Sequence, residues 1–559
     1  MSLAVIALLF LFLLVTAYRL YGGWIAKQFS VSDENITPAH KVNDGIDFVP
    51  TKRFYLFAQH FSAIAAAGPI AGPIIACQVW GWVPCLFWIS FGVVLVGAVH
   101  DFSSLTASVR HGARSIAEIM KELLGPRAGL AMLLFIWIAL VYVIISFTEI
   151  TAASFTSVIE ELEGLPIGFN GGGAVAAAST MYLLLAILMG LVQKFLNPPL
   201  WLATTIFVPA TFVIAWMGTE VSTILLLDAR TWAMLILAYC AVASVMPVWS
   251  LLQPRGYLGG FILFVALGLG VLGVFFGGYE VKAEPFKSWD AGGMTGAMFP
   301  FLFVTIACGA CSGFHGLVCS GTTSKQVDRE SHMQTVGFGG MLAEGFVALI
   351  ALVTVMIVTP EEIVGMRPGR IYGNGIGQFL TIIIGKENLP FAITFGAMAF
   401  STFVFDTLDV STRLGRYILQ ELFGWRTRFG ATMASAITIS IPALILVFSE
   451  KDAYVRFWTL FGSSNQLLAA LSLLAITIWL HRARRRIWFT LLPMLFVLSI
   501  TLWSLVQLSL ANFESAEGLD VPLFNAIAST ALILLAMYLL IESLIKIGKE
   551  KGGARSARP

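Results

Sequence analysis

Two of the long apolar stretches in this chain are interrupted near their middles by glycine and proline. The first carries Gly68-Pro69-Ile70-Ala71-Gly72-Pro73, and the second carries Gly309-Ala310-Cys311-Ser312-Gly313-Phe314-His315-Gly316. Proline removes a helical hydrogen bond and glycine weakens the helical backbone, so neither stretch is expected to form one continuous helix. In a bilayer such a break must face protein, water or a ligand. A matching pair of breaks is typical of a transporter binding site.

The composition predicts an all-α polytopic membrane protein. Of the 559 residues, 58% are hydrophobic and only 12% are charged, which leaves too few polar side chains to cover a water-facing surface. About 15 apolar stretches are long enough to cross a hydrocarbon core about 30 Å thick: residues 2–21, 54–78, 79–99, 127–150, 174–192, 198–217, 231–249, 257–277, 294–316, 337–358, 389–409, 429–448, 456–480, 487–509 and 522–546. The six cysteines lie in or at the ends of these stretches, so no disulfide framework is expected.

The charges of the loops predict how the chain crosses the membrane. Basic residues favour cytoplasmic loops, and here basic loops alternate with acidic or mixed ones. One basic loop is His481-Arg482-Ala483-Arg484-Arg485-Arg486, and the tail from 547 is also basic. The alternation predicts an N-terminus outside and a C-terminus in the cytoplasm. The net charge of +2 is small and dispersed, which argues against nucleic acid as a partner.

This topology makes the two broken spans run in opposite directions, which predicts an inverted repeat. The predicted organisation is a leading helix at 1–21, a first five-helix repeat at 54–217, two linking helices at 231–277, a second five-helix repeat at 294–480, two trailing helices at 487–546 and a basic cytoplasmic tail at 547–559. The repeat is inferred from hydropathy and loop charge, because the halves share no residue-level identity beyond the broken spans. The alternative is coincidence, since glycine is common in membrane helices.

Several blocks of sequence resemble the carbon starvation protein A family of inner-membrane transporters. They are Gln59 to Pro69 with Gly72-Pro73, Gly97 to Phe102, Ile306 to Ala310 with Ser312 to His315, Ser320 to Gln326, Asp406 to Asp409 with Thr412-Arg413, and Phe461 to Ala469. The resemblance covers residues 54 to 480. Gln59, Cys311 and Ser324 differ from the residues that are usual in that family.

The resemblance implies a fold and a function. The family is similar to the amino acid, polyamine and organocation superfamily, whose core is the inverted five-helix repeat of the leucine transporter. Its members are associated with uptake of peptides and of pyruvate when carbon is short, and pyruvate entry is proton coupled. The resemblance therefore implies a symporter in a bacterial-type inner membrane.

The breaks are the predicted substrate site. Each half-helix after a break begins with free N–H groups and a positive dipole end, which suit a carboxylate. The predicted substrate-binding residues are Gly68, Pro69, Gly72, Pro73, Gly309, Ser312, Gly313, Phe314 and His315. Pyruvate and peptides both offer a carboxylate, so this feature does not separate them. The alternative is a proline kink filled by a neighbouring helix.

Ionisable and polar residues inside the spans are candidates for ion coupling. Asp406 and Asp409 share a helical face, and by the resemblance they and Thr407 bind sodium with backbone carbonyls near the first break, or one aspartate carries the proton. The alternative is an ion pair with Arg413 or Arg416. The other predicted coupling residues are His60, which with His315 suits a proton-coupled step, and Glu344.

Three further predictions concern polar residues near span ends or breaks. His100 and Asp101 end a span at the cytoplasmic face, where they act as a gate or as a structural cap. Asn465 and Gln466 interrupt span 456–480 and favour interhelical hydrogen bonds. A weaker hypothesis gives His60, Cys308 and His315 a metal ion, since a cysteine and histidine stripe runs along the second broken span.

The leading hypothesis is a secondary transporter that imports a small carboxylate or short peptides by alternating access. Its coupling ion is a proton or sodium, and no other cofactor is expected. A membrane metabolite sensor is the first alternative, although no soluble signalling domain is present in the sequence. An intramembrane metal-dependent enzyme is the second, and the chain is predicted not to be an enzyme.

Overall fold

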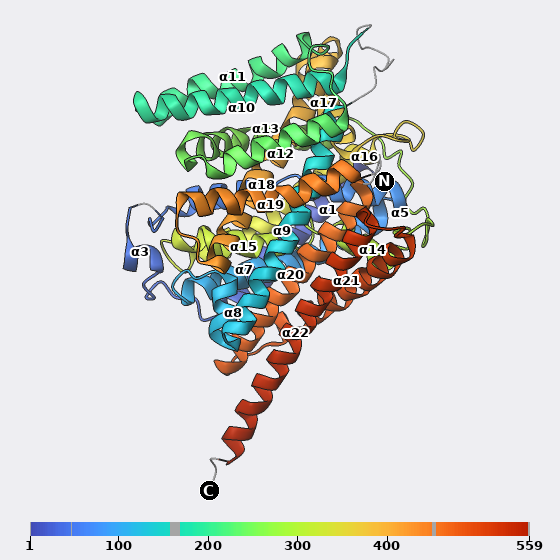
Figure 1. Cartoon of the computed structure of the whole chain (residues 1–559). Helices are drawn as coiled ribbons and strands as arrows, with labels where there is room; N and C mark the ends of the chain where they lie inside the picture. Colours follow the sequence, from blue (N-terminus) through green and yellow to red (C-terminus); the bar gives the residue numbers. More distant parts are fainter. Residues whose placement is uncertain (1, 46, 157–167, 450–453, 557–559) are drawn as a thin grey trace.

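The computed structural model describes residues 2–45, 47–156, 168–449 and 454–556. Residues 157–167, inside the predicted first repeat, and 557–559 of the predicted tail lie outside this description. The described chain is helical throughout (Figure 1). This confirms the predicted fold class of an all-α polytopic membrane protein.

The helices of the first half of the chain are α1 (Leu3–Thr16), α2 (Gly23–Gln28), α3 (Pro38–Val42), α4 (Arg53–Ile64), α5 (Gly68–Trp80), α6 (Trp82–Gly92), α7 (Ala98–Arg110), α8 (Ile116–Leu124), α9 (Pro126–Phe155), α10 (Gly171–Phe195) and α11 (Leu200–Glu220). Two π-helical segments, η1 (Ala17–Gly22) and η2 (Val93–Gly97), join α1 to α2 and α6 to α7. These junctions make two continuous long helices.

The second half contains α12 (Ala229–Val245), α13 (Leu252–Phe276), α14 (Met298–Thr305), α15 (Gly313–Gly321), α16 (Gly339–Met356), α17 (Pro368–Ile384), α18 (Leu389–Phe423), α19 (Arg428–Phe448), α20 (Tyr454–Arg482), α21 (Trp488–Ser515) and α22 (Val521–Ser556). Short segments are η3 (Val248–Ser250), η4 (Thr323–Lys325), η5 (Gln334–Phe338) and η6 (Lys386–Asn388).

Twelve described helices are long and apolar enough to cross a membrane, and the bent pair α4 and α5 makes a thirteenth span. The two other predicted spans are shorter than expected. Helix α12 has 17 residues, and the second broken span consists of α14 with 8 residues and α15 with 9. Helix α17 was missed, because its sequence is rich in glycine and was assigned to a loop.

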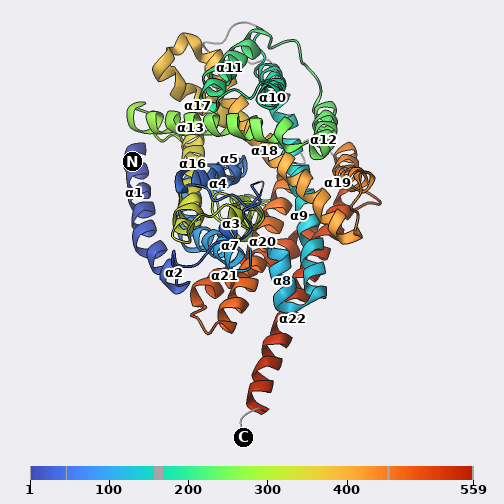
Figure 2. The same ribbon diagram turned by 90° about the vertical axis from the view of Figure 1, so that its left-hand side faces the viewer.

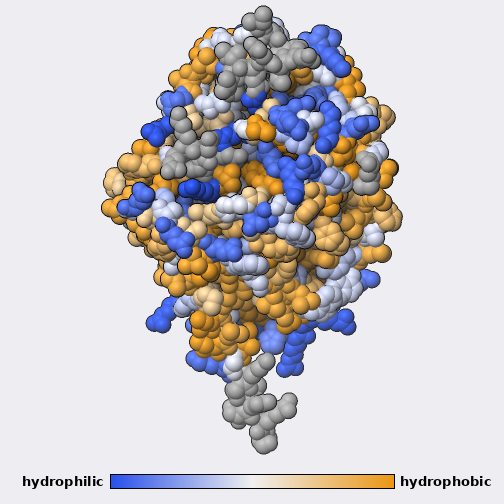
Figure 3. Space-filling view, turned by 90° about the vertical axis from the view of Figure 1, so that its right-hand side faces the viewer, coloured by the Kyte–Doolittle hydropathy of each residue, from blue (hydrophilic) through white to orange (hydrophobic). Residues whose placement is uncertain are grey.

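The broken helices lie inside the bundle. Helices α4, α5 and α7 are surrounded by α13, α16, α20 and α21 (Figure 2). Hydrophobic side chains cover much of the face in Figure 3, and many large ones are exposed, such as Phe12, Leu184 and Phe276. An exposed apolar surface of this extent fits contact with lipid. The C-terminal end of α22 projects beyond the other helices (Figures 1 and 2).

Candidate functional site

The first break lies between α4 and α5, which meet at an angle of 44°. Pro69 occupies the first turn of α5, where its missing N–H leaves no intrahelical bond unmade. The backbone then passes very close to the second broken span. A Cβ at Gly68 would clash with Cys308 Sγ, and one at Gly72 would lie 2.6 Å from the Thr305 carbonyl oxygen. The predicted breaks therefore contact each other.

The second break separates α14 from α15, and Asn465 of α20 holds it in place. Asn465 Oδ1 accepts a hydrogen bond of 2.9 Å from the backbone N–H of Phe314. Asn465 Nδ2 donates to Ser312 Oγ at 3.0 Å and to Cys308 Sγ at 3.3 Å. The predicted interhelical hydrogen bonds of Asn465 are thus present, and Gln466 makes another to the Phe303 carbonyl. One N–H at the start of α15 is already satisfied by protein.

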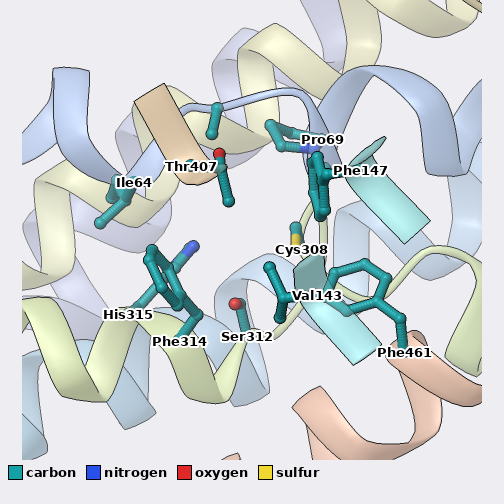
Figure 4. A pocket seen from close by; sticks show the side chains of 12 residues that line it. Ile64, Pro69, Val143, Phe147, Cys308, Ser312, Phe314, His315, Thr407 and Phe461 are labelled. Carbon is teal, nitrogen blue, oxygen red and sulfur yellow. The ribbon is translucent and has the colours of Figure 1, made fainter. Parts of the chain in front are cut away.

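The two breaks enclose one cavity, which α9, α18 and α20 complete (Figure 4). Its lining residues are Ile64, Ala66, Gly68, Pro69, Val143, Phe147, Cys308, Ser312, Phe314, His315, Thr407 and Phe461. We call it the central cavity. It leaves about 10 Å³ for the centre of a water molecule, which is room for about one water. A carboxylate or peptide enters this cavity only if the surrounding helices separate.

Some of the predicted substrate-binding residues line the central cavity and others pack around it. Lining residues are Gly68, Pro69, Ser312, Phe314 and His315. The remainder are Gly72 and Pro73 inside α5, Gly309 against Ala348 and Pro69, and Gly313 against the Asn465 backbone.

Sequence reasoning missed three large apolar residues of the lining. Val143 and Phe147 come from α9, and Phe461 comes from α20. Val143 and Phe147 are apolar residues within a long apolar helix, so no feature of the sequence separates them from ordinary core residues. Phe461 stands out only as the first residue of the block Phe461 to Ala469.

A buried polar network reaches the central cavity through His315. Asp101 of α7 lies between two histidines: Oδ1 is 2.8 Å from His100 Nδ1, and Oδ2 is 2.9 Å from His315 Nδ1. The other ring nitrogen of His315 lies 3.1 Å from Glu344 Oε2 of α16. All four side chains are at most 1% exposed. The network joins α7, α15 and α16 across the interior.

The contacts of His315 favour one extra proton in this network. An ionised carboxylate can only accept hydrogen bonds, so the two contacts of His315 need a donor on each side. Either His315 carries both ring protons, or it is neutral and one of Asp101 and Glu344 is protonated. Both arrangements contain one proton more than a neutral imidazole with two carboxylates. Losing that proton would point a ring lone pair at a carboxylate oxygen, which is unfavourable in a buried site.

The three residues of the metal hypothesis have separate partners. His60 Nδ1 lies 2.9 Å from Thr323 Oγ1, Cys308 accepts from Asn465, and His315 bonds to the two carboxylates. Within the described residues, no group of three or more histidine, cysteine, aspartate or glutamate side chains is placed to hold a metal ion. The described residues thus do not gather His60, Cys308 and His315 around one metal position.

His100 and Asp101 do not end their helix, as the sequence predicts, but lie near the start of α7. The apolar run ends at residue 99, but the helix continues through α7 to Arg110. Its continuation carries hydroxyl residues such as Ser104 and Ser108 that are buried against other helices. Hydropathy cannot distinguish such a buried polar helix from a loop, so the predicted span was too short.

Asp406 and Asp409 face a buried arginine that lies in the sequence between the predicted spans 231–249 and 257–277. Arg255 of α13 is fully buried, and its guanidinium lies 2.7 Å from Asp406 Oδ1 and 2.6 Å from Asp409 Oδ2. Tyr239 of α12 donates to Asp409 Oδ2 at 2.9 Å. The ion pair is thus with Arg255 and not with Arg413, which donates to backbone carbonyls of α12 and Met246. Thr407, between the aspartates, lines the central cavity.

A segment that we call the strap, residues 30–43, precedes the first broken span and binds the loop that follows the second. Glu330 of that loop accepts from Arg110 at 2.5 and 2.7 Å and from Asn35 Nδ2 at 2.9 Å. Asp33 accepts from the Ser331 backbone N–H and hydroxyl, both at 2.9 Å. The backbone hydrogen bond from Ser331 lowers the pKa of Asp33, so this contact stays charged in mildly acidic solution.

The sequence matches the profile of the family described as carbon starvation protein CstA over residues 1–374 and 366–504. The chain belongs to the CstA family. Its relatives include a protein of Bacillus subtilis (strain 168) named peptide transporter CstA, which is 31% identical over 96% of this chain and 95% of that protein. A pyruvate/proton symporter, BtsT of Escherichia coli (strain K12), is 30% identical over 90% of this chain and 81% of that protein.

The family assignment confirms the resemblance noted in the sequence. This CstA-family chain is a multi-pass membrane transporter, and its relatives are named transporters rather than enzymes. Among solved structures it is similar to a manganese transporter of Eremococcus coleocola, with a TM-score of 0.45, 13% identity and coverage of 90% of this chain and 97% of that one.

Proposed function

We propose that this CstA-family protein is a secondary active transporter that imports short peptides or a small carboxylate such as pyruvate by alternating access, coupled to protons. The carrying observation is that both helix breaks enclose the central cavity and that His315, one of its lining residues, belongs to the buried proton network. Substrate and proton therefore meet at the same side chain. The names of the relatives support both substrate classes.

Proton coupling follows from the geometry of His315. A substrate carboxylate in the central cavity favours a protonated His315, because opposite charges attract strongly away from water. A proton on the network in turn favours the bound anion. Such mutual stabilisation is what couples two binding events. Asp406, Thr407 and Asp409 remain the candidates for a sodium site. The comparison of a proton gradient with a sodium gradient in the uptake experiment tests this alternative.

Alternating access requires that each end of the pathway can close. The strap and its contacts with Glu330 and Ser331 cover one end, next to the basic residues at 481–486, where Arg485 bonds to Gln28 and Ser30. We infer that this end faces the cytoplasm of a bacterial inner membrane and that the N-terminus lies outside, as the loop charges predict. We also retain the inverted repeat of 54–217 and 294–480 as part of this proposal.

Uptake into proteoliposomes tests the proposed function. Labelled pyruvate and labelled L-alanyl-L-alanine are offered to the wild-type protein under an imposed proton gradient and, separately, a sodium gradient. We expect accumulation of at least one substrate under the proton gradient. The variant E344Q should lose gradient-driven accumulation but keep exchange of internal for external substrate, because the cavity remains and only the carboxylate is removed.

The variant H481Q serves as the control, since His481 is exposed at the end of α20. It should behave as the wild type. If the wild type accumulates neither substrate under either gradient, the proposed function is wrong. Accumulation by E344Q at the wild-type level would exclude Glu344 from coupling.

A further inference from the structure

A second cavity, which we call the outer vestibule, lies at the opposite end of α20 from the strap. Its volume is about 210 Å³, and its walls include Arg456, Phe457, Ser515, Glu517, Asp520 and Asn525. Sites for drug-sized molecules are usually about 300–1,000 Å³, so this one suits a smaller molecule. Its floor is buried, since Phe457 is 0% and Asn525 2% exposed, whereas Arg456 and Glu517 are exposed.

The outer vestibule and the central cavity are neighbours along α20. Phe457 lines the vestibule and Phe461 lines the central cavity, one turn apart on α20. Helix α9 follows the same path: Ser146 donates to the Phe457 carbonyl at 2.9 Å, and its neighbour Phe147 lines the central cavity.

Three aromatic rings pack together where the linings of the two cavities approach each other. The ring centroids of Phe147, Trp458 and Phe461 lie 5.2 to 5.7 Å apart. Trp458 is fixed further by its hydrogen bond of 3.0 Å to the Thr305 carbonyl, directly beside the second break. A movement of the broken span therefore shifts one of the rings that pack where the two linings approach each other.

The charges of the outer vestibule are of both signs. Arg456 offers one guanidinium, while Glu517 and Asp520 offer two carboxylates. Asp520 accepts the backbone N–H groups of Glu517 and Leu523 at 2.8 and 3.0 Å, and these bonds lower its pKa. The vestibule thus carries a net negative charge with one positive group on its wall.

This pattern disfavours a simple anion and suits a zwitterion. A monocarboxylate would gain one partner in Arg456 but meet two carboxylates of its own sign. A short peptide has an ammonium group at one end and a carboxylate at the other, so both ends find an opposite charge. We propose that the outer vestibule is a peripheral binding site for zwitterionic short peptides, which wait there before the aromatic rings open. The inference rests on the proposed transport function and deepens its choice of substrate.

Uptake kinetics of substrates that differ in their charged groups test this site in proteoliposomes. The substrates are L-alanyl-L-alanine, its N-acetylated form, which lacks the ammonium group, and pyruvate. For the free dipeptide, E517Q should raise KM about twofold to fivefold, the range of an exposed ion pair. For the acetylated dipeptide, E517Q should leave KM unchanged. The variant R456Q should raise KM for both forms, and the maximal rate should not fall.

The matched control is E514Q, because Glu514 is exposed on α21 but does not line the vestibule. Equal KM values for E517Q and E514Q would overturn the proposal, as would a rise that is the same for acetylated and free dipeptide. Transport of pyruvate without any transport of the dipeptide would overturn the proposed peptide site in the outer vestibule and leave the proposed transport function intact.

If the wild type transports nothing, the proposed function is wrong. Equilibrium binding then tests whether the outer vestibule is a peptide-binding site. Binding of L-alanyl-L-alanine to purified full-length protein is then compared among wild type, R456Q and E514Q. Weaker binding to R456Q alone supports the site. Absence of binding, or equal binding to all three proteins, overturns it.

Discussion

At Gly72, in the first broken span, the backbone leaves no room for a side chain. A Cβ there would lie 2.6 Å from a backbone oxygen, that of Thr305, and a backbone atom cannot turn away as a flexible side chain can. We expect G72A to lower the free energy of unfolding by about 1–3 kcal/mol, the usual cost of overpacking, and to impair transport. Thermal unfolding of the purified protein in detergent measures this change.

The control for that substitution is G23A in α2. A Cβ at Gly23 would meet nothing within 4 Å, so alanine there should be neutral or slightly stabilising. Equal melting temperatures for G72A and the wild type would show that the two broken spans are not held in contact at this point.

The ion pair of Arg255 should also be essential to stability. Replacing this arginine leaves Asp406 and Asp409 with like charges and without their cation, and loss of one partner of a buried ion pair costs about 3–5 kcal/mol. We expect R255M to unfold at a clearly lower temperature. The double variant R255M/D409N should recover part of the loss, because one uncompensated charge is removed.

The exposed Arg230 of α12 provides the control R230M, which should unfold like the wild type. A melting temperature of R255M equal to that of R230M would mean that the carboxylates find another partner or take up protons at no cost.

The sequence revealed these residues unequally. Glycine and proline are visible wherever they interrupt an apolar run, so the breaks and five of the twelve residues that line the cavity could be predicted. Arg255 falls between two predicted spans because charge normally marks the end of a span, and only the folded bundle brings two aspartates from residues 406 and 409 to it. Phe147 carries no local signal, since its role comes from where α9 packs.

Among the elements, the strap is the one whose release should open the molecule. Arg110, at the end of α7, donates to the Ser30 carbonyl of the strap and to Glu330, and Glu330 also accepts from Asn35 of the strap. The variant R110E places two like charges in contact and should loosen this end. Cys308 lines the central cavity and is 9% exposed, so its modification by a water-soluble thiol reagent should become faster. Mass spectrometry of the modified protein gives the rate.

Two further variants make this measurement specific. R114E breaks an exposed ion pair with Glu122 nearby and should not change the rate. The charge swap R110E/E330R should slow modification toward the wild-type rate. The strap would not be a closing element if R110E and R114E gave the same rate.

Prediction of the elements succeeded where a helix is apolar along its length and failed where it carries hydroxyl residues or many glycines. Helix α19 has much exposed surface and α20 is almost wholly buried, yet the bounds of both were predicted to within two residues. Helix α7 continues with serine and threonine, and α17 is rich in glycine, because both pack against protein rather than lipid. Close packing of small residues is common between membrane helices, and hydropathy alone does not detect it.

At the scale of the whole molecule, the two cavities and the strap follow one line through the bundle. Helix α20 has 29 residues, or about 44 Å at 1.5 Å per residue, which exceeds a hydrocarbon core of about 30 Å. Phe457, near the start of this helix, faces the outer vestibule, Phe461 faces the central cavity, and the basic residues after its end adjoin the strap. The molecule thus has a polar cavity at one end and, at the other, the strap beside the basic loop 481–486.

Loop charge predicts which end of this line faces the cytoplasm. The two ends of α21 offer a test of that orientation. This helix of 28 residues separates Arg484, in the basic loop, from Glu517, in the outer vestibule. Because α21 crosses the membrane once, cysteines placed at these two positions should be labelled from opposite sides. We expect a membrane-impermeant maleimide to label E517C in intact cells and R484C only after the membrane is broken.

The native cysteines are all buried in the folded chain and should react little, as the wild-type protein will show. Labelling of both variants in intact cells would place both loops outside and exclude α21 as a span, whereas the reverse order would mean that basic charge does not mark the cytoplasmic side of this transporter.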